Sequence, residues 1–214
     1  MKNVDDLIDS AAELSARGLS KGEIADELNV SRETASWLVD RADHDTGDVD
    51  RDTGDADRGG PHDIHVDWSA LGRDSKRLSF AGRAMADLVA ADDEVDLAVG
   101  IEKAGTPLAT TVARELDTDL ATYAPRKHQW EEGDLENLGA AFSKNFADIR
   151  GRDCYVIDDT ITSGTTMEEA IQAVRDQGGT PVGCVVLVDK RGVDEIDGVP
   201  VQSLLQVLRV GEGE

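Results

Sequence analysis

The spacing of apolar residues changes twice along the chain and divides it into three zones. In residues 1–42, apolar side chains recur every three or four positions, which predicts amphipathic helices. Residues 43–63 hold almost no large apolar side chain, which predicts a flexible acidic linker. In residues 64–214, short apolar runs alternate with helical patterns. We therefore expect a small all-α domain, a linker and a larger α/β domain.

The third zone predicts a parallel sheet flanked by helices. Its apolar runs are nearly continuous, as expected of strands that are buried on both faces. The predicted strands are residues 96–99, 120–123, 154–157, 182–188 and 201–205. The predicted helices are residues 78–91, 106–116 and 166–176.

The first zone predicts three short helices with recognisable ends. Gly18 ends the first helix, and Ser20 caps the second with Glu23 completing a capping box. Asn29 lies in the next turn, and Ser31 caps the third helix.

The second and third predicted helices resemble the helix-turn-helix of bacterial and archaeal repressors. Residues 24–38 read Ile-Ala-x-x-Leu-x-Val-Ser-x-x-Thr-Ala-Ser-x-Leu, with a small residue where the helices cross. In that motif the third helix enters the major groove of double-stranded DNA. The resemblance implies that the DNA contacts come from Ser31, Arg32, Glu33, Ser36, Trp37 and Arg41. The alternative is a helical cap that only packs or mediates dimerisation, which the net acidic character of the segment favours.

The charge balance is strongly acidic, with 45 acidic and 22 basic side chains and a formal net charge of −23. Acidic side chains keep a protein hydrated in concentrated salt, where screening weakens their mutual repulsion. We therefore expect a halophilic, archaeal source, and a basic patch is no fair test of DNA binding here. No segment has the length and apolarity of a signal peptide or membrane span, which predicts a cytoplasmic protein with no membrane partner.

The candidate metal-binding patterns in the chain are incomplete. The repeat at residues 45–58 places aspartates at alternate positions, but Thr53 and Gly59 stand where a calcium loop needs Gly and Glu. The four histidines and two cysteines lack zinc-ligand spacing. Cys154 and Cys184 lie in apolar runs that predict neighbouring strands, which is typical of a reducing interior. The sequence thus predicts no metal site.

A run of acidic and hydroxyl residues follows the predicted strand 154–157. Residues 156–166 read Val-Ile-Asp-Asp-Thr-Ile-Thr-Ser-Gly-Thr-Thr and lead into a helix. Adjacent carboxylates can accept hydrogen bonds from ribose hydroxyls, and a turn at a helix N-terminus can hold a phosphate. We expect a cradle for a sugar 5-phosphate, made by Asp158, Asp159, Thr160, Thr162, Ser163, Gly164, Thr165 and Thr166.

This run resembles the phosphoribosyl-pyrophosphate motif of the type I phosphoribosyltransferases. A second element is similar to the pyrophosphate loop of that family, because residues 99–108 read Val-Gly-Ile-Glu-Lys-Ala-Gly-Thr-Pro-Leu. The resemblance covers about residues 65–210 and implies a type I phosphoribosyltransferase-like fold. It also implies a ligand such as phosphoribosyl pyrophosphate and a pyrophosphate loop made by Glu102, Lys103, Ala104 and Gly105.

The stretch that would form the catalytic lid departs from the transferase pattern. Arg126, Lys127 and His128 are present, but a second lysine is missing and Trp130 and two glutamates follow. Glutamates repel pyrophosphate, and a leaving group without cationic partners is poorly stabilised. We therefore expect no transferase activity; if the chain is an enzyme, Arg126, Lys127 and Asp159 are the catalytic candidates.

A retained cradle, an altered lid and a helix-turn-helix resemble the phosphoribosyltransferase-like transcriptional regulators of haloarchaea. The resemblance implies a homodimer that binds promoter DNA, controls sugar-catabolism genes and senses a phosphorylated metabolite. No cofactor is required, and Mg²⁺ is expected only as an ion carried by a pyrophosphate ligand. The alternative is an active orotate-type or purine-type phosphoribosyltransferase.

Several aromatic side chains near the site have two interpretations. Trp130, Phe142 and Phe146 could cover a ligand, but aromatic residues at this spacing more often pack over the sheet. His65 and Trp68 begin the third zone, and we interpret them as edge packing rather than as part of the site.

Overall fold

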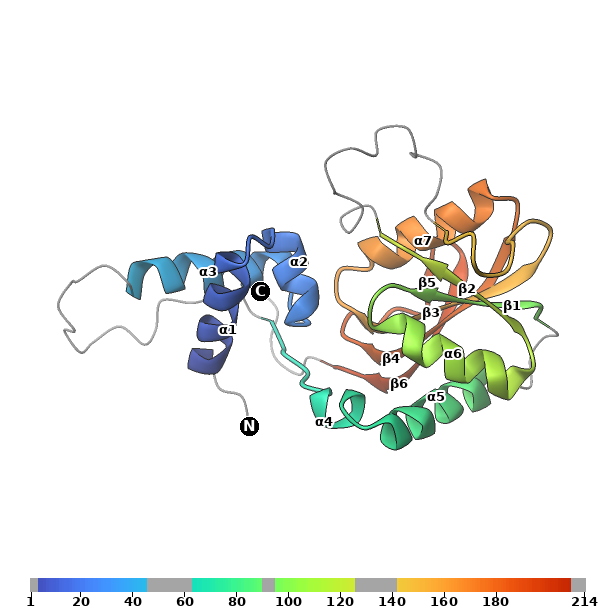
Figure 1. Cartoon of the computed structure of the whole chain (residues 1–214), viewed down its shortest axis with the longest axis horizontal. Helices are drawn as coiled ribbons and strands as arrows, with labels where there is room; N and C mark the ends of the chain where they lie inside the picture. Colours follow the sequence, from blue (N-terminus) through green and yellow to red (C-terminus); the bar gives the residue numbers. More distant parts are fainter. Residues whose placement is uncertain (1–3, 46–62, 90–94, 126–141, 209–214) are drawn as a thin grey trace. The chain divides into compact units, whose positions relative to one another are not determined.

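The computed structural model describes residues 4–45, 63–89, 95–125 and 142–208 (Figure 1). It divides the chain into two compact units, Met1–Asp67 and Trp68–Glu214. Each unit has its own hydrophobic core.

The first unit is built from α1 (Val4–Ala16), α2 (Lys21–Glu27) and α3 (Arg32–Asp45). Its core is made by apolar side chains from all three helices: Leu7, Ala11, Leu14, Ile24, Ala25, Leu28, Val30, Ala35, Leu38 and Val39. The helix α3 continues three residues beyond the boundary expected at residue 42. No glycine or proline interrupts the sequence before Gly47, so nothing local ends the helix earlier.

The predicted helix ends of this unit are confirmed. The chain leaves α1 at Gly18, whose φ of +87° is a left-handed conformation that suits glycine. The Ser20 hydroxyl accepts from the Glu23 N–H, and the Glu23 carboxylate accepts from the Ser20 N–H at 2.7 Å. The Ser31 hydroxyl accepts from the Thr34 N–H at 3.1 Å at the start of α3. These local hydrogen bonds fix where α2 and α3 begin.

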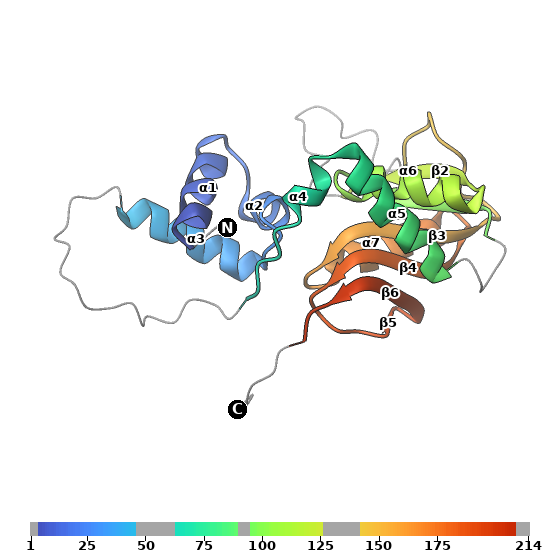
Figure 2. The same ribbon diagram turned by 90° about the horizontal axis from the view of Figure 1, so that it is seen from below.

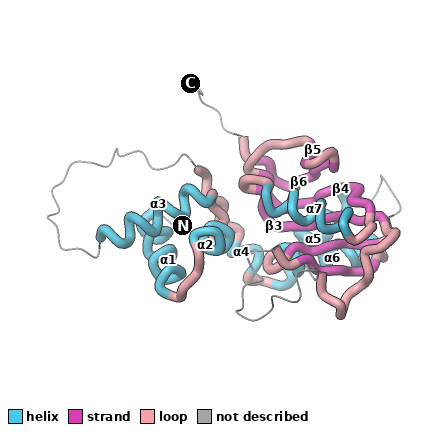
Figure 3. Tube along the Cα trace, turned by 90° about the horizontal axis from the view of Figure 1, so that it is seen from above, coloured by secondary structure: helices cyan, strands magenta, loops and turns pink. Residues whose placement is uncertain are grey.

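The second unit is a six-stranded sheet with helices on both faces. Figure 3 shows the strands side by side with α7 lying across one face, and Figure 2 shows α5 and α6 on the other. The strand order is β2-β1-β3-β4-β6-β5, and every pairing is parallel except that of β5 with β6. In chain order the elements are α4 (Ser69–Gly72), α5 (Ser75–Val89), β1 (Leu97–Ile101), α6 (Gly105–Leu116), β2 (Asp119–Tyr123), β3 (Asp153–Ile161), α7 (Thr165–Asp176), β4 (Thr180–Asp189), β5 (Glu195–Ile196) and β6 (Val199–Gln206).

Each of the five predicted strands and three predicted helices has a counterpart, but one boundary matters for the site. The predicted central strand ends at residue 157, whereas β3 continues to Ile161. The strand β1 pairs with β3 only as far as Ile157, while β4 continues alongside through Asp158, Thr160 and Ile161. The acidic pair therefore lies within β3, at the point where one of its two neighbours has ended. The short elements α4 and β5 were not predicted.

The two cysteines lie on neighbouring strands, as predicted. Cys154 is in β3 and Cys184 in β4, and both are buried free thiols. Burial raises the pKa of each thiol to about 12. Within the described residues, no helix has the length and apolarity needed to cross a membrane.

Candidate functional site

The candidate site lies at the carboxyl ends of β1 and β3. In a parallel sheet this edge is where connecting loops meet and where ligands bind. Asp158 and Asp159 are 9% and 8% exposed, although neither side chain is apolar. Buried carboxylates need hydrogen-bond donors, so the groups around this pair define the site.

The Asp159 carboxylate is held by donors from two distant parts of the second unit. The Trp68 indole Nε1 donates to its Oδ2 at 3.0 Å, and the Thr160 hydroxyl donates to the same oxygen at 3.1 Å. The Asp159 N–H donates to Asp158 Oδ1 at 2.8 Å. Burial raises the pKa of Asp159, and these hydrogen bonds only partly oppose the shift. A ligand hydroxyl that donates to this carboxylate would stabilise its charged form.

The loop that follows β3 has the features expected of an anion site. Gly164 has a φ of +87° and precedes α7, whose first backbone N–H groups have no partner within the helix. Ser163 and Thr165 are exposed, and the Ser163 hydroxyl accepts from the Thr165 N–H at 3.4 Å. Backbone N–H groups and hydroxyls thus gather at the positive end of a helix, where a phosphate is stabilised.

An arginine that the sequence analysis missed braces this loop. Arg191 Nη1 donates to the Ser163 carbonyl oxygen at 3.0 Å and lies 3.6 Å from Glu168 Oε1. The buried carboxylate of Asp189, at the end of β4, accepts from the N–H groups of Arg191 and Gly192. The φ of Gly164 favours glycine, and a side chain at this position would also displace the Arg191 guanidinium. The sequence feature that could have indicated this role is an aspartate directly after the predicted strand 182–188, followed by Lys-Arg-Gly.

The predicted pyrophosphate loop lies directly beside the cradle. It connects β1 to α6, and a Cβ at Gly105 would come within 2.6 Å of the Ile157 carbonyl oxygen and 3.0 Å of Asp158 Oδ1. Lys103 is exposed on this loop, and the Glu102–Lys103 peptide is cis. The two loops predicted from separate stretches of sequence are therefore brought together, with a cation available to an anionic ligand.

The aromatic residues divide between packing and exposure. Phe142 packs against Tyr123 with ring centroids 5.5 Å apart, as predicted, whereas Phe146 is 43% exposed. The interpretation of Trp68 as edge packing was incomplete, because its ring rests against Gly72 and its indole N–H also donates to Asp159 in the candidate site. The lid candidates Arg126, Lys127, His128 and Trp130 lie outside the described residues.

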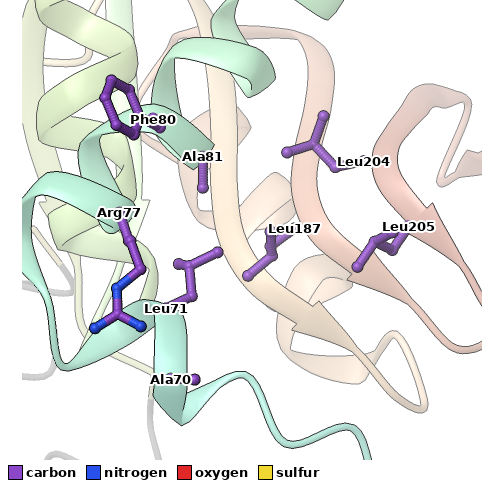
Figure 4. A pocket seen from close by; sticks show the side chains of 8 residues that line it. All are labelled: Ala70, Leu71, Arg77, Phe80, Ala81, Leu187, Leu204 and Leu205. Carbon is purple, nitrogen blue, oxygen red and sulfur yellow. The ribbon is translucent and has the colours of Figure 1, made fainter.

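A second, separate hollow has the wrong chemistry for a phosphate. It has a volume of about 550 Å³ and lies between α4, α5 and the strands β4 and β6 (Figure 4). Its lining is mostly aliphatic, with a single aromatic and a single charged side chain: Ala70, Leu71, Arg77, Phe80, Ala81, Leu187, Leu204 and Leu205. An anionic sugar phosphate is therefore better matched by the polar cradle than by this hollow.

In the first unit, the candidate DNA-contacting side chains lie in different environments. Arg32 and Glu33 are exposed, whereas Trp37 is half-buried against the core and carries the Arg41 guanidinium 5.4 Å from its ring centroid. The Ser31 hydroxyl is used as a helix cap.

A lysine that was not predicted to take part lies beside the predicted recognition helix. Lys21 Nζ donates to the Ser36 hydroxyl at 2.7 Å and to Asp40 Oδ1 at 2.9 Å. A cation at the start of α2 is therefore placed next to the predicted contact Ser36.

The second unit has the type I phosphoribosyltransferase fold, and the candidate phosphate cradle and predicted pyrophosphate loop lie together at the carboxyl ends of its strands. The phosphoribosyl transferase domain model matches residues 67–201. Orotate phosphoribosyltransferase of Mycobacterium tuberculosis, solved with inorganic phosphate, aligns with a TM-score of 0.54 and 23% identity. The alignment covers 67% of this chain and 78% of that one, and at this identity it supports the fold alone.

Two haloarchaeal proteins are similar over their whole length. The chain is 70% identical over 215 residues to a protein of Halorubrum lacusprofundi named Transcriptional regulator GfcR, covering 100% of both chains. It is 68% identical over 216 residues to the protein of that name in Haloarcula marismortui, covering 99% of this chain and 98% of the relative. The chain therefore belongs to the phosphoribosyltransferase family, in the group of the GfcR transcriptional regulators.

Proposed function

We propose that this protein is a DNA-binding transcriptional regulator that senses a phosphorylated sugar. One observation carries the proposal: a candidate cradle for phosphate and sugar hydroxyls, with Asp159 and Ser163 held by distant side chains, shares a chain with a three-helix unit. The relatives named as transcriptional regulators support the DNA-binding half of the proposal. The ligand half is supported by the buried Asp158–Asp159 pair and the N–H groups at the start of α7.

The sensing step requires a ligand that binds the cradle and changes DNA binding. Phosphoribosyl pyrophosphate or a related compound would place its phosphate at Thr162–Thr166, its hydroxyls at Asp158 and Asp159, and a pyrophosphate near Lys103. Any Mg²⁺ would enter with the pyrophosphate. In a homodimer, such binding would change the separation of two helix-turn-helix units, which must match the spacing of two half-sites.

The deciding experiment is binding to promoter fragments at molar KCl, with and without phosphoribosyl pyrophosphate. We expect sequence-selective binding whose affinity changes with the ligand, and the bound fragments should include promoters of sugar-catabolism genes. An Arg32→Ala, Ser36→Ala double variant should lose selectivity. Arg17→Ala is the control, because it removes an exposed cation outside α2 and α3. Unaltered selectivity of the double variant would contradict the assigned recognition helix.

The same preparation tests the transferase alternative. Continuous release of pyrophosphate from phosphoribosyl pyrophosphate with orotate or a purine base, abolished by Lys127→Ala, would identify an enzyme. We expect no such release. Light scattering on the same samples tests the expected homodimer.

A further inference from the structure

Trp68 connects the cradle to the beginning of the second unit. Its indole N–H donates to Asp159 Oδ2 at 3.0 Å, across 91 positions of sequence. This oxygen belongs to one of the two carboxylates that would accept the hydroxyls of a sugar. The indole therefore occupies a position that a ligand hydroxyl would need.

The ring of Trp68 is fixed to the short helix α4. A Cβ at Gly72 would lie 2.5 Å from Cζ3 and 3.1 Å from Cε3 of the ring, so the ring rests against the backbone of Gly72. Trp68 is also the residue that precedes α4. A displacement of the indole must consequently displace α4 or rotate the ring away from Gly72.

The helix α4 is weakly anchored. None of its residues is buried. Ala70 and Leu71 line one side of the apolar hollow, while Leu187 and Leu204 lie on the opposite side (Figure 4). An element with little buried surface beside an open hollow can change position at low cost.

The position of Trp68 in the chain allows such a movement to reach the first unit. The second unit begins at Trp68, and Asp67 belongs to the first unit, which contains α2 and α3. A shift of α4 therefore acts directly on the covalent connection between the sugar site and the predicted DNA-binding helices.

We propose that Trp68 is a positioning residue that reports occupancy of the sugar site. A ligand hydroxyl replaces the indole as the donor to Asp159, and the released indole and α4 move the connecting segment. Inorganic phosphate has no vicinal hydroxyls to offer, so it fills the loop before α7 without displacing Trp68. This inference rests on the proposed function and adds the residue through which binding of the sugar hydroxyls acts on the rest of the chain.

The test compares ribose 5-phosphate with inorganic phosphate on the full chain and on Trp68→Phe, which retains a ring but has no donor. Wild type should show a tryptophan fluorescence change with ribose 5-phosphate that inorganic phosphate does not produce, and Trp68→Phe should lack it. Calorimetry should find that Trp68→Phe binds ribose 5-phosphate about fivefold more tightly, as expected when one competing hydrogen bond is removed. Its affinity for inorganic phosphate should equal that of wild type, and its DNA binding should no longer respond to the sugar phosphate.

A second variant guards against a folding defect in the first. Gly72→Ala places a methyl group where the ring rests and should dislodge the indole while leaving it present. We expect the same gain in affinity for ribose 5-phosphate, together with the wild-type thermal transition. If both variants keep wild-type sugar affinity and a ligand-dependent DNA response, the role of Trp68 is wrong and the sensor proposal stands. If wild type binds neither ribose 5-phosphate nor phosphoribosyl pyrophosphate, the proposed function fails and this inference fails with it.

Discussion

At the scale of single residues, the candidate site depends on buried polar groups. Asp159 is the clearest case, because burial raises its pKa while Trp68 and Thr160 donate to one of its oxygens. For a carboxyl with a raised pKa, the stabilising contribution is complete below the ordinary value of about 3.9 and is lost as the pH rises through the folded-state value. The ionised group therefore opposes folding at neutral pH.

We predict that Asp159→Asn stabilises the free protein at neutral pH relative to acidic pH. The amide oxygen can still accept from Trp68, and the buried charge is removed. Urea unfolding at about pH 4 and about pH 7, in molar KCl, measures the effect as a difference in unfolding free energy between variant and wild type. That difference should shift in favour of the variant as the pH rises. A difference that does not depend on pH would contradict the raised pKa.

The two thiols should be inert in the folded protein. Cys154 and Cys184 are buried, and a pKa of about 12 leaves almost no thiolate at neutral or mildly alkaline pH. We predict that Ellman's reagent labels both only at the rate of unfolding. The control is the same reaction in guanidinium chloride, where two thiols per chain should react at once. Rapid labelling of the native protein would show that β3 and β4 open readily.

At the scale of elements, the site is made by two loops that meet only because of a glycine. The carbonyl oxygen of Ile157 in β3 and the start of α6 approach so closely at Gly105 that no side chain fits between them.

We predict that Gly105→Ala destabilises the second unit by about 1–3 kcal/mol, the usual cost of overpacking. It should also weaken binding of phosphoribosyl pyrophosphate, because the loop carrying Lys103 is pushed away from Asp158. Denaturation and calorimetry measure the two effects. Gly22→Ala is a matched control, since a Cβ in α2 would meet only the end of the Arg32 side chain at 3.3 Å. Equal stability and ligand affinity in wild type and Gly105→Ala would show that the loops are not tightly juxtaposed.

The elements also show which parts of the structure the sequence could predict. Strands buried on both faces and helices with local caps, such as the Ser20–Glu23 box, are encoded by neighbouring residues. The polar end of β3 was missed because its strand character comes from pairing with β4 and not from its own side chains. The roles of Trp68 and Arg191 were missed for a related reason, because their partners are distant in sequence. Trp68 lies 91 positions from Asp159, and Arg191 lies 28 positions from Ser163. Short-range patterns predicted the candidate cradle, whereas the groups that hold it in place could be found only from the fold.

At the scale of the whole molecule, the large negative net charge lowers the stability of the fold in dilute buffer. A formal net charge of −23 over 214 residues makes the folded chain repel itself in dilute buffer. Salt shortens the screening length from about 10 Å at 0.1 M to about 3 Å at 1 M, which removes most of that repulsion.

We predict that the melting temperature rises steadily as KCl increases from dilute to molar concentrations. Circular dichroism at fixed pH measures it, and NaCl serves as a comparison because screening by a monovalent salt should be similar. A melting temperature that stays constant or falls with salt would show that the acidic surface does not limit stability.

The cradle occupies one uninterrupted stretch of chain, since β3, the loop before α7, α7 and β4 follow one another from Asp153 to Asp189. In evolutionary terms, such a stretch is inherited as a block. Substitutions elsewhere in the sequence leave this stretch unchanged, so the binding of a ligand and the catalysis of its reaction can change independently. A regulator that evolves from an enzyme can therefore bind its effector at the site that held the substrate of the enzyme. Under the proposed function, the added part is a DNA-binding unit, and the helical unit that ends at Asp67 is the candidate for it.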